Sequence, residues 1–253
     1  MLLQAAGRQA GKAISRIRVI RGCYGTITME ARMNIFLIAA FVFAALQALA
    51  LQKNWFRLEV IAKPGVMATL LIWLVSSAGL DGALLWFGLG ILFSLAGDVL
   101  LMISLDRLFL AGLVAFLLAH VAYIIGFNIP VPEISLWGIA LAVIIGVGGA
   151  RVIRRILSAV EAKGQGRMRM PIIVYGVVIS VMVLSAMMKQ TDLTWEAGAA
   201  LLVGVGAVLF YISDIILAWN KFVAPIRHGR IYNILAYHLG QIALIAGVIA
   251  QYS

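Results

Sequence analysis

Two aspartates lie deep inside otherwise apolar stretches of this chain. Asp98 stands in Gly-Ile-Leu-Phe-Ser-Leu-Ala-Gly-Asp-Val-Leu-Leu-Met (residues 90–102) and Asp214 in Val-Leu-Phe-Tyr-Ile-Ser-Asp-Ile-Ile-Leu-Ala-Trp (residues 208–219). A carboxylate at membrane depth costs about 2.5–3.5 kcal/mol on insertion scales, so it rarely persists without a function or a partner. Two neighbouring, partly desolvated carboxyl groups do not both ionise easily, so a pair of them can supply one acid and one base.

The composition places these aspartates in a membrane protein. Of the 253 residues, 64% are hydrophobic and 12% are charged, and a soluble domain of this size cannot hide so much apolar surface from water. Long apolar runs favour helices over a barrel, whose strands alternate apolar and polar residues. The net charge of +10 lies in the tail and the loops, which favours anionic lipid headgroups as its partners rather than nucleic acid.

The apolar runs predict an all-α, integral membrane bundle of eight transmembrane helices. The chain divides into a basic tail, residues 1–32, and a transmembrane domain, residues 33–251. The expected spans are 33–51, 64–80, 82–104, 107–127, 134–150, 170–188, 197–219 and 230–251. Most connections are short, so neighbouring helices run antiparallel.

Lys and Arg in the loops predict the orientation. The odd-numbered connections are rich in basic residues: Lys53, Arg57, Lys63, Arg107, Arg151, Arg154, Arg155, Lys163, Arg167, Arg169, Lys221, Arg227 and Arg230. The even-numbered connections carry only Lys189. Basic loops stay in the cytoplasm, so the odd-numbered loops are expected there, in a bacterial inner membrane.

The tail disagrees with this orientation, because its six Arg and Lys residues would prefer the cytoplasm although it precedes a span that starts outside. Its Arg-rich, acid-poor composition also resembles an organellar transit peptide. A third interpretation, which we favour, is that the natural protein begins near Met29 or Met33. The oligomeric state and the organism stay open.

An internal repeat relates the two halves of the transmembrane domain. Asp98 and Asp214 each follow a small residue, and His120 and His238 recur at nearly the same spacing in the spans that come next. The pattern predicts two four-helix halves in parallel orientation. Chance similarity between short stretches is the alternative.

Helical rise places the polar side chains along the spans. Asp98 and Asp214 lie ~9 and ~8 Å from the cytoplasmic ends, with His238 ~12 Å and His120 ~20 Å deep. Lys63 and Asn220 are expected at the cytoplasmic rim. The other candidates share helix faces with these residues, and they are Tyr123, Tyr211, Tyr237 and Gln241. We expect polar groups of the third, fourth, seventh and eighth spans to line one cavity.

Each candidate also has a purely structural interpretation. An intramembrane aspartate or histidine can be a hydrogen bond between helices, a tyrosine a packing or interface residue, and Lys63 an orienting charge whose ammonium extends to the interface. No Gly-x-Ser-x-Gly, His-Glu-x-x-His or Walker motif is present. We expect no cofactor. A metal held by two Asp and two His is a minority interpretation, because the depth of His120 argues against it as a ligand.

Four stretches resemble one family of membrane proteins. They are Phe-Ser-Leu-Ala-Gly-Asp-Val-Leu-Leu-Met (93–102), His-Val-Ala-Tyr (120–123), Tyr-Ile-Ser-Asp-Ile-Ile-Leu-Ala-Trp-Asn-Lys-Phe (211–222) and Tyr-His-Leu-Gly-Gln (237–241), and they are similar to the YhhN or lysoplasmalogenase family. The Lys63-Pro64 pair is similar too. The chain departs from the pattern at Lys221, where arginine is expected, and His238 is not characteristic of its place.

The resemblance implies an eight-helix hydrolase that cleaves the vinyl ether bond of a lysophospholipid substrate and releases a fatty aldehyde and a glycerophospho-alcohol. It maps the catalytic pair onto Asp98 and Asp214. The chemistry fits, because protonation of the vinyl ether gives an oxocarbenium ion that water attacks, much as in glycosidases. Which aspartate is the acid stays open. A small-solute or proton-coupled transporter and a structural subunit are the alternatives.

Overall fold

The computed structural model describes residues 35–104, 107–131, 133 and 135–253, and in this part of the chain every regular element is helical. The first helix is Ile35–Lys53. The helices that follow are α2 (Phe56–Ala78), α3 (Ala83–Ile103), α4 (Phe109–Phe127), α5 (Leu136–Ala162), α6 (Arg169–Met188), α7 (Ala197–Ala218) and α8 (Gly229–Tyr252). All eight of these described helices are long and apolar enough to cross a membrane, which confirms the predicted class. The tail, residues 1–32, lies outside the described residues.

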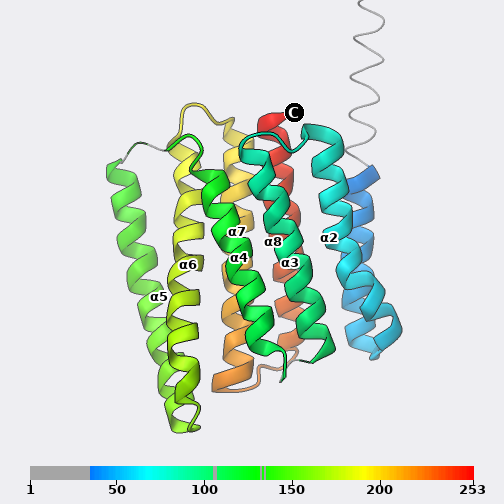
Figure 1. Ribbon diagram of the computed structural model, residues 1–253, viewed down its shortest axis with the longest axis vertical. Coiled ribbons are helices and arrows are strands. Elements are labelled where there is room, and N and C mark those ends of the chain that lie inside the picture. The colour runs from blue at the N-terminus through cyan, green and yellow to red at the C-terminus, as the bar shows by residue number, and fades with distance from the viewer. Residues whose placement is uncertain (1–34, 105–106, 132, 134) are drawn as a thin grey trace, which may run out of the picture.

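Four helices form the centre of the bundle. Helix α3 packs along α4 and helix α7 along α8, while α2 and α6 flank the centre on opposite sides and α5 lies beyond α6 (Figure 1). The contacts of the first half recur in the second: α2 with α3 corresponds to α6 with α7, and α4 with α6 corresponds to α8 with α2. This packing agrees with two parallel four-helix halves.

Glycines allow the central pairs to approach closely. A Cβ on Gly206 of α7 would lie 2.7 Å from the Gly240 carbonyl oxygen of α8, and backbone at that distance leaves no room for a side chain. In the first half, Gly97 of α3 accommodates the ring of Phe116 from α4. Small residues of this kind let membrane helices pack without a hydrophobic driving force.

Three helix boundaries differ from the sequence prediction by four residues or more. Helix α2 begins at Phe56, so Pro64 lies inside it and not at its first turn. The polar residues before Pro64 are helical because two of them have partners: Glu59 pairs with Arg230 and Lys63 with Asp98. These two pairs help to offset the hydrogen bond that Pro64, without an N–H, cannot donate inside the helix.

The other two boundaries lengthen helices at the basic end. Helix α5 continues to Ala162, because arginines such as Arg151 and Arg154 are exposed and extend its polar end. Helix α7 continues as a π-helical turn, Trp219–Val223. That extra turn places Asp214 deeper below the helix end than the sequence indicated.

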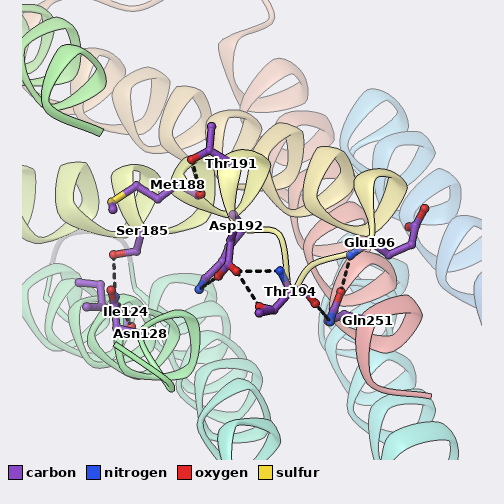
Figure 2. Close-up of polar contacts among 10 residues, drawn as sticks. Ile124, Asn128, Ser185, Met188, Thr191, Asp192, Thr194, Glu196 and Gln251 are labelled. Carbon is purple, nitrogen blue, oxygen red and sulfur yellow. Dashed lines mark hydrogen bonds and ion pairs between the residues drawn. The ribbon is translucent and has the colours of Figure 1, made fainter. Parts of the chain in front are cut away.

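The connection between α6 and α7 closes the opposite end of the bundle (Figure 2). Asp192 accepts hydrogen bonds from Thr194, and Gln251 of α8 accepts from the Glu196 backbone N–H. Partial burial raises the pKa of the Asp192 carboxyl, but hydrogen bonds from Thr194 and Lys189 outweigh it and leave the pKa below its usual value. Backbone N–H groups of Gly198 and Ala199, at the start of α7, lower the pKa of Glu196.

Candidate active site

A polar cavity of about 520 Å³ lies among the first helix, α2, α3, α7 and α8, near the end where α3 stops and α8 starts. Its ionisable lining residues come from four helices, and they are Glu59, Lys63, Asp98, Asp214, Arg230 and Tyr237. Both aspartates therefore line one cavity. Lys63 and Tyr237, two further candidates, line it with them.

Asp98 has a hydrogen-bond partner on each carboxyl oxygen. The Lys63 ammonium lies 3.1 Å from Oδ1, and the Tyr237 hydroxyl donates to Oδ2 at 2.8 Å. Only 2% of the Asp98 side chain and 11% of the Lys63 side chain are exposed. Receiving hydrogens on both oxygens is the pattern of a carboxylate, which accepts and does not donate.

Asp214 has a different environment. Its Oδ2 accepts a hydrogen bond from the Tyr175 hydroxyl and lies 3.2 Å from His120 Nε2, and these two partners are themselves 3.0 Å apart. Among the described residues, nothing hydrogen-bonds to its Oδ1. The side chain is 11% exposed, against 2% for Asp98, so Asp214 has one oxygen available to a substrate.

The contact between His120 and Asp214 corrects the estimated depth of His120. Rise along the expected span put His120 ~20 Å deep, well beyond the aspartates. The estimate failed because α4 begins at Phe109 rather than at residue 107 and α7 extends to Val223, so the two side chains lie level with each other. The depth argument against His120 as a ligand therefore falls. Even so, the described residues contain no group of three His, Cys, Asp or Glu side chains suited to a metal.

Tyr175 is the site residue that sequence reasoning missed. It belongs to α6, which corresponds to α2 in the repeat, and α2 supplies Lys63 to the other aspartate. Aligning Pro64 with Pro171 puts Met170 opposite Lys63, so the repeat does not point to Tyr175. The two flanking helices supply their partner side chains from different turns.

An apolar cavity of about 70 Å³ meets the polar cavity at Asp214. The two cavities share Leu101, Phe116, Asp214 and Leu217. Apart from Asp214, Tyr175 and Tyr211, the side chains that line the smaller cavity are apolar and come from α3 to α7 and the π-helical turn. The predicted site residue Tyr211 is thus at this cavity, with its hydroxyl 3.3 Å from Ser180 Oγ.

Two predicted residues form a buried network beyond the polar cavity. The Tyr123 hydroxyl donates to Gln241 Oε1 at 2.8 Å, and Gln241 Nε2 donates to Ser94 at 2.9 Å. None of the three lines either cavity. Phe87 and Phe127, both fully buried, pack next to Tyr123 and its neighbours. This layer is polar but internally satisfied, so its contribution is to hold α3, α4 and α8 together.

Two other predicted residues lie away from both cavities. Asn220 Oδ1 accepts a hydrogen bond from the Ile226 backbone N–H and so shapes the turn between α7 and α8. His238 is 1% exposed, and neither ring nitrogen has a hydrogen-bond partner among the described residues. The structure therefore does not bring Asn220 or His238 to the aspartate pair.

Comparisons with known proteins identify the family of this chain. Lysoplasmalogenase TMEM86B of Homo sapiens is 26% identical over 218 residues, which cover 84% of this chain and 84% of the human protein. The Mus musculus and Rattus norvegicus proteins of the same name are 26% and 25% identical, over 83% of this chain and 83% and 80% of their own lengths. No solved structure matches the chain. The model of the YhhN family matches residues 58–248, which include both aspartates and all their partners, and the chain therefore belongs to the YhhN family.

Proposed function

We propose that this YhhN-family protein is a membrane-embedded hydrolase that cleaves the vinyl ether bond of lysoplasmalogen-like lysolipids. The relatives named above are lysoplasmalogenases, which are enzymes and hydrolases. The observation that carries the proposal is the meeting of a polar and an apolar cavity at Asp214, with Asp98 in the polar one. A lysolipid has the same division, because its polar glycerophosphate and its fatty chain join at the ether oxygen.

The proposed reaction assigns the two aspartates different roles. Asp214, with one oxygen free of protein partners, gives its proton to the β-carbon of the vinyl ether and leaves an oxocarbenium ion. Asp98, held by Lys63 and Tyr237, takes a proton from the water that attacks this ion. The hemiacetal then collapses to a fatty aldehyde and the glycerophospho-alcohol, and the proton held by Asp98 is free to return to solvent through the polar cavity.

His120 and Tyr175 support the acid in this scheme. Both contact Oδ2 of Asp214 and leave Oδ1 to the substrate, so they fix the orientation of the carboxyl group. They also offer groups that can restore its proton after each turnover. The first carbons of the fatty chain would lie next to Asp214, against Phe109, Leu113 and their apolar neighbours.

Hydrolysis in D₂O tests the chemistry directly. Protonation at the β-carbon predicts an aldehyde with one deuterium at its second carbon when the product is reduced as it forms. An aldehyde that carries no deuterium would mean that the bond breaks by another route. Saturated ether lysolipids, which have no carbon–carbon double bond to protonate, are the matched control and should release no aldehyde.

The transporter alternative keeps one supporting feature. Pro64 lies inside α2, and a proline that interrupts a membrane span is typical of transporter helices. Against transport, the described residues beyond Asp98 offer no open polar path, because Ser94, Tyr123 and Gln241 are buried and satisfy one another. Solute flux into proteoliposomes without aldehyde release would favour the transporter.

We also propose that the odd-numbered loops face the cytoplasm of a bacterial inner membrane. Lys189, the one basic residue on the even-numbered side, is 1% exposed and is paired with Asp192 at 2.9 Å. It therefore presents no free charge to that surface, which strengthens the charge asymmetry. Single cysteines placed at Gly164 and Leu193 are labelled from outside intact cells, and the proposal predicts label at Leu193. Label at Gly164 alone would show the reverse orientation.

A further inference from the structure

A pair of opposite charges stands at the mouth of the polar cavity. Arg230 Nη2 of α8 lies 3.2 Å from Glu59 Oε1 of α2, and both residues line the cavity that holds Asp98 and Asp214. The Arg230 side chain is 74% exposed and the Glu59 side chain 16%. Exposed ion pairs contribute only about 0–1 kcal/mol, so a ligand with matching charges can replace this one at little cost.

The other charges of the cavity are already engaged more deeply. Lys63 is bound to Asp98, and Asp214 to Tyr175 and His120. Lys63, which the sequence placed at the cytoplasmic rim, is therefore committed to an aspartate. Among the described lining residues, Arg230 is the cation that remains for an anionic group, and Glu59 is the acid beside it.

The spacing along the helices fits the length of a lysolipid. Glu59 precedes Lys63 by one turn, a rise of ~6 Å, and Arg230 precedes Tyr237 by two turns, a rise of ~10 Å. Since Lys63 and Tyr237 both bind Asp98, the rim pair lies about that far from the reacting centre. In a lysoplasmalogen about seven bonds separate the phosphorus from the β-carbon, or ~8 Å at the advance per bond of an extended chain.

From this geometry we infer that Glu59 and Arg230 form a binding site for a zwitterionic headgroup, with the phosphate on Arg230 and the ammonium on Glu59. The inference rests on the proposed function, because it assumes a lysolipid in this cavity. Guanidinium binds phosphate oxygens through paired N–H donors, and the neighbouring carboxylate then meets the positive ammonium group that a choline or ethanolamine headgroup carries. A headgroup that ends in bare phosphate would gain Arg230 but meet repulsion from Glu59.

Binding of saturated ether lysolipids tests the inference without relying on hydrolysis. The full chain in nanodiscs is titrated with 1-O-alkyl-glycerophosphocholine and with 1-O-alkyl-glycerophosphate, each in competition with a fluorescent lysolipid. Wild type should prefer the choline lipid about fivefold, the free-energy equivalent of one favourable exposed ion pair. Glu59→Gln should abolish the preference, and Arg230→Gln should lower the affinity for both lipids.

A matched ion pair at the same end supplies the controls. Arg169 of α6 and Glu161 of α5 are also paired and exposed but do not line the cavity. Glu161→Gln and Arg169→Gln should leave the lipid preference unchanged. A preference that survives Glu59→Gln would overturn the inference, even in an active hydrolase. Headgroup discrimination that depends on Glu59 without any release of aldehyde from vinyl ether lipids would instead sink the hydrolase proposal and keep the binding site.

Discussion

Asp98 and Asp214 lie at equivalent places in the two halves of the bundle, yet their surroundings differ. Each is contacted by a flanking helix of its own half and by a central helix of the other half: Lys63 and Tyr237 for Asp98, Tyr175 and His120 for Asp214. A lysine and a tyrosine hold the first aspartate, whereas a tyrosine and a histidine hold the second. The first is almost sealed from solvent, whereas the second joins two cavities.

The difference shows how a repeated scaffold can become chemically asymmetric. The central helices supply two carboxyl groups at one level, and the flanking helices α2 and α6 give them different partners. An acid and a base must differ in proton affinity, and different partners are the means by which proteins separate two carboxyl groups. The proposed acid is the aspartate beside the apolar cavity, where the chain of a substrate would begin.

Removing Lys63 should have the largest effect on the surroundings of Asp98. Lys63→Met leaves a buried carboxylate without its cation, which costs about 3–5 kcal/mol where the partner charge stays buried. We expect aldehyde release to fall at least 100-fold, measured on the folded fraction in detergent. Lys189→Met, which removes a buried and paired lysine from the opposite end, is the control. It should lower stability but leave kcat of the folded protein near wild type.

Of the two histidines of the repeat, we expect only His120 to be needed for activity. His120→Leu removes a contact to Asp214, and we expect kcat to fall about 100-fold. His238→Leu removes a buried ring with no hydrogen-bond partner among the described residues, which should leave stability unchanged or raise it by about 1 kcal/mol. Thermal unfolding and aldehyde release are measured together. Equal losses of activity in both variants would remove the distinction between the halves.

Two tyrosine hydroxyls allow a test of independence. Tyr175→Phe and Tyr237→Phe each remove one hydrogen bond to an aspartate, worth about 1 kcal/mol, so each should lower kcat roughly five- to tenfold. Because the two hydroxyls bind different aspartates, the changes in activation free energy of the two single variants should add in the double variant. An additive cycle in kcat/KM supports separate environments, whereas strong coupling would show that the hydroxyls act on one shared group.

The smallest expected effect concerns the Lys189–Asp192 pair, which shares its charge pattern with Lys63–Asp98. Because the pKa of Asp192 is lowered in the folded protein, its stabilisation is present above about pH 4 and is lost as the pH falls below that value. Asp192→Asn should therefore lower the melting temperature at pH 6 by about 2 °C and by less at pH 3. A larger difference at pH 3 would contradict this sign, and aldehyde release at neutral pH should stay unchanged.

Much of the fold could be predicted from the sequence, because membrane helices must satisfy every backbone group internally and so appear as long apolar runs. Eight such runs correspond to the eight membrane-spanning helices in the described part of the chain. Boundaries failed where polar residues continue a helix, as at Arg57 to Lys63 in α2 and at the arginines of α5. Pattern alone does not show that Glu59 and Lys63 have partners 171 and 35 residues away.

The candidate site could likewise be predicted only in part from the sequence. Intramembrane cost identified Asp98 and Asp214, and the resemblance to the YhhN family is confirmed by the match over residues 58–248. The partners of the aspartates were harder to predict, since no sequence pattern distinguishes Tyr175 from the other residues of its apolar helix. The depth of His120 was wrong because an error of a few residues at two helix ends adds up to several ångströms. Glu59 and Arg230 looked like ordinary interfacial charges until the fold placed them together.

In the proposed mechanism the two aspartates act together on one bond. The most direct test of this mechanism is aldehyde release from a lysoplasmalogen by purified Asp98→Asn and Asp214→Asn proteins whose thermal unfolding matches wild type. We predict that each retains less than about one hundredth of wild-type kcat, because each lacks a group that gives or takes a proton. Full aldehyde release by either folded variant would contradict the two-aspartate mechanism.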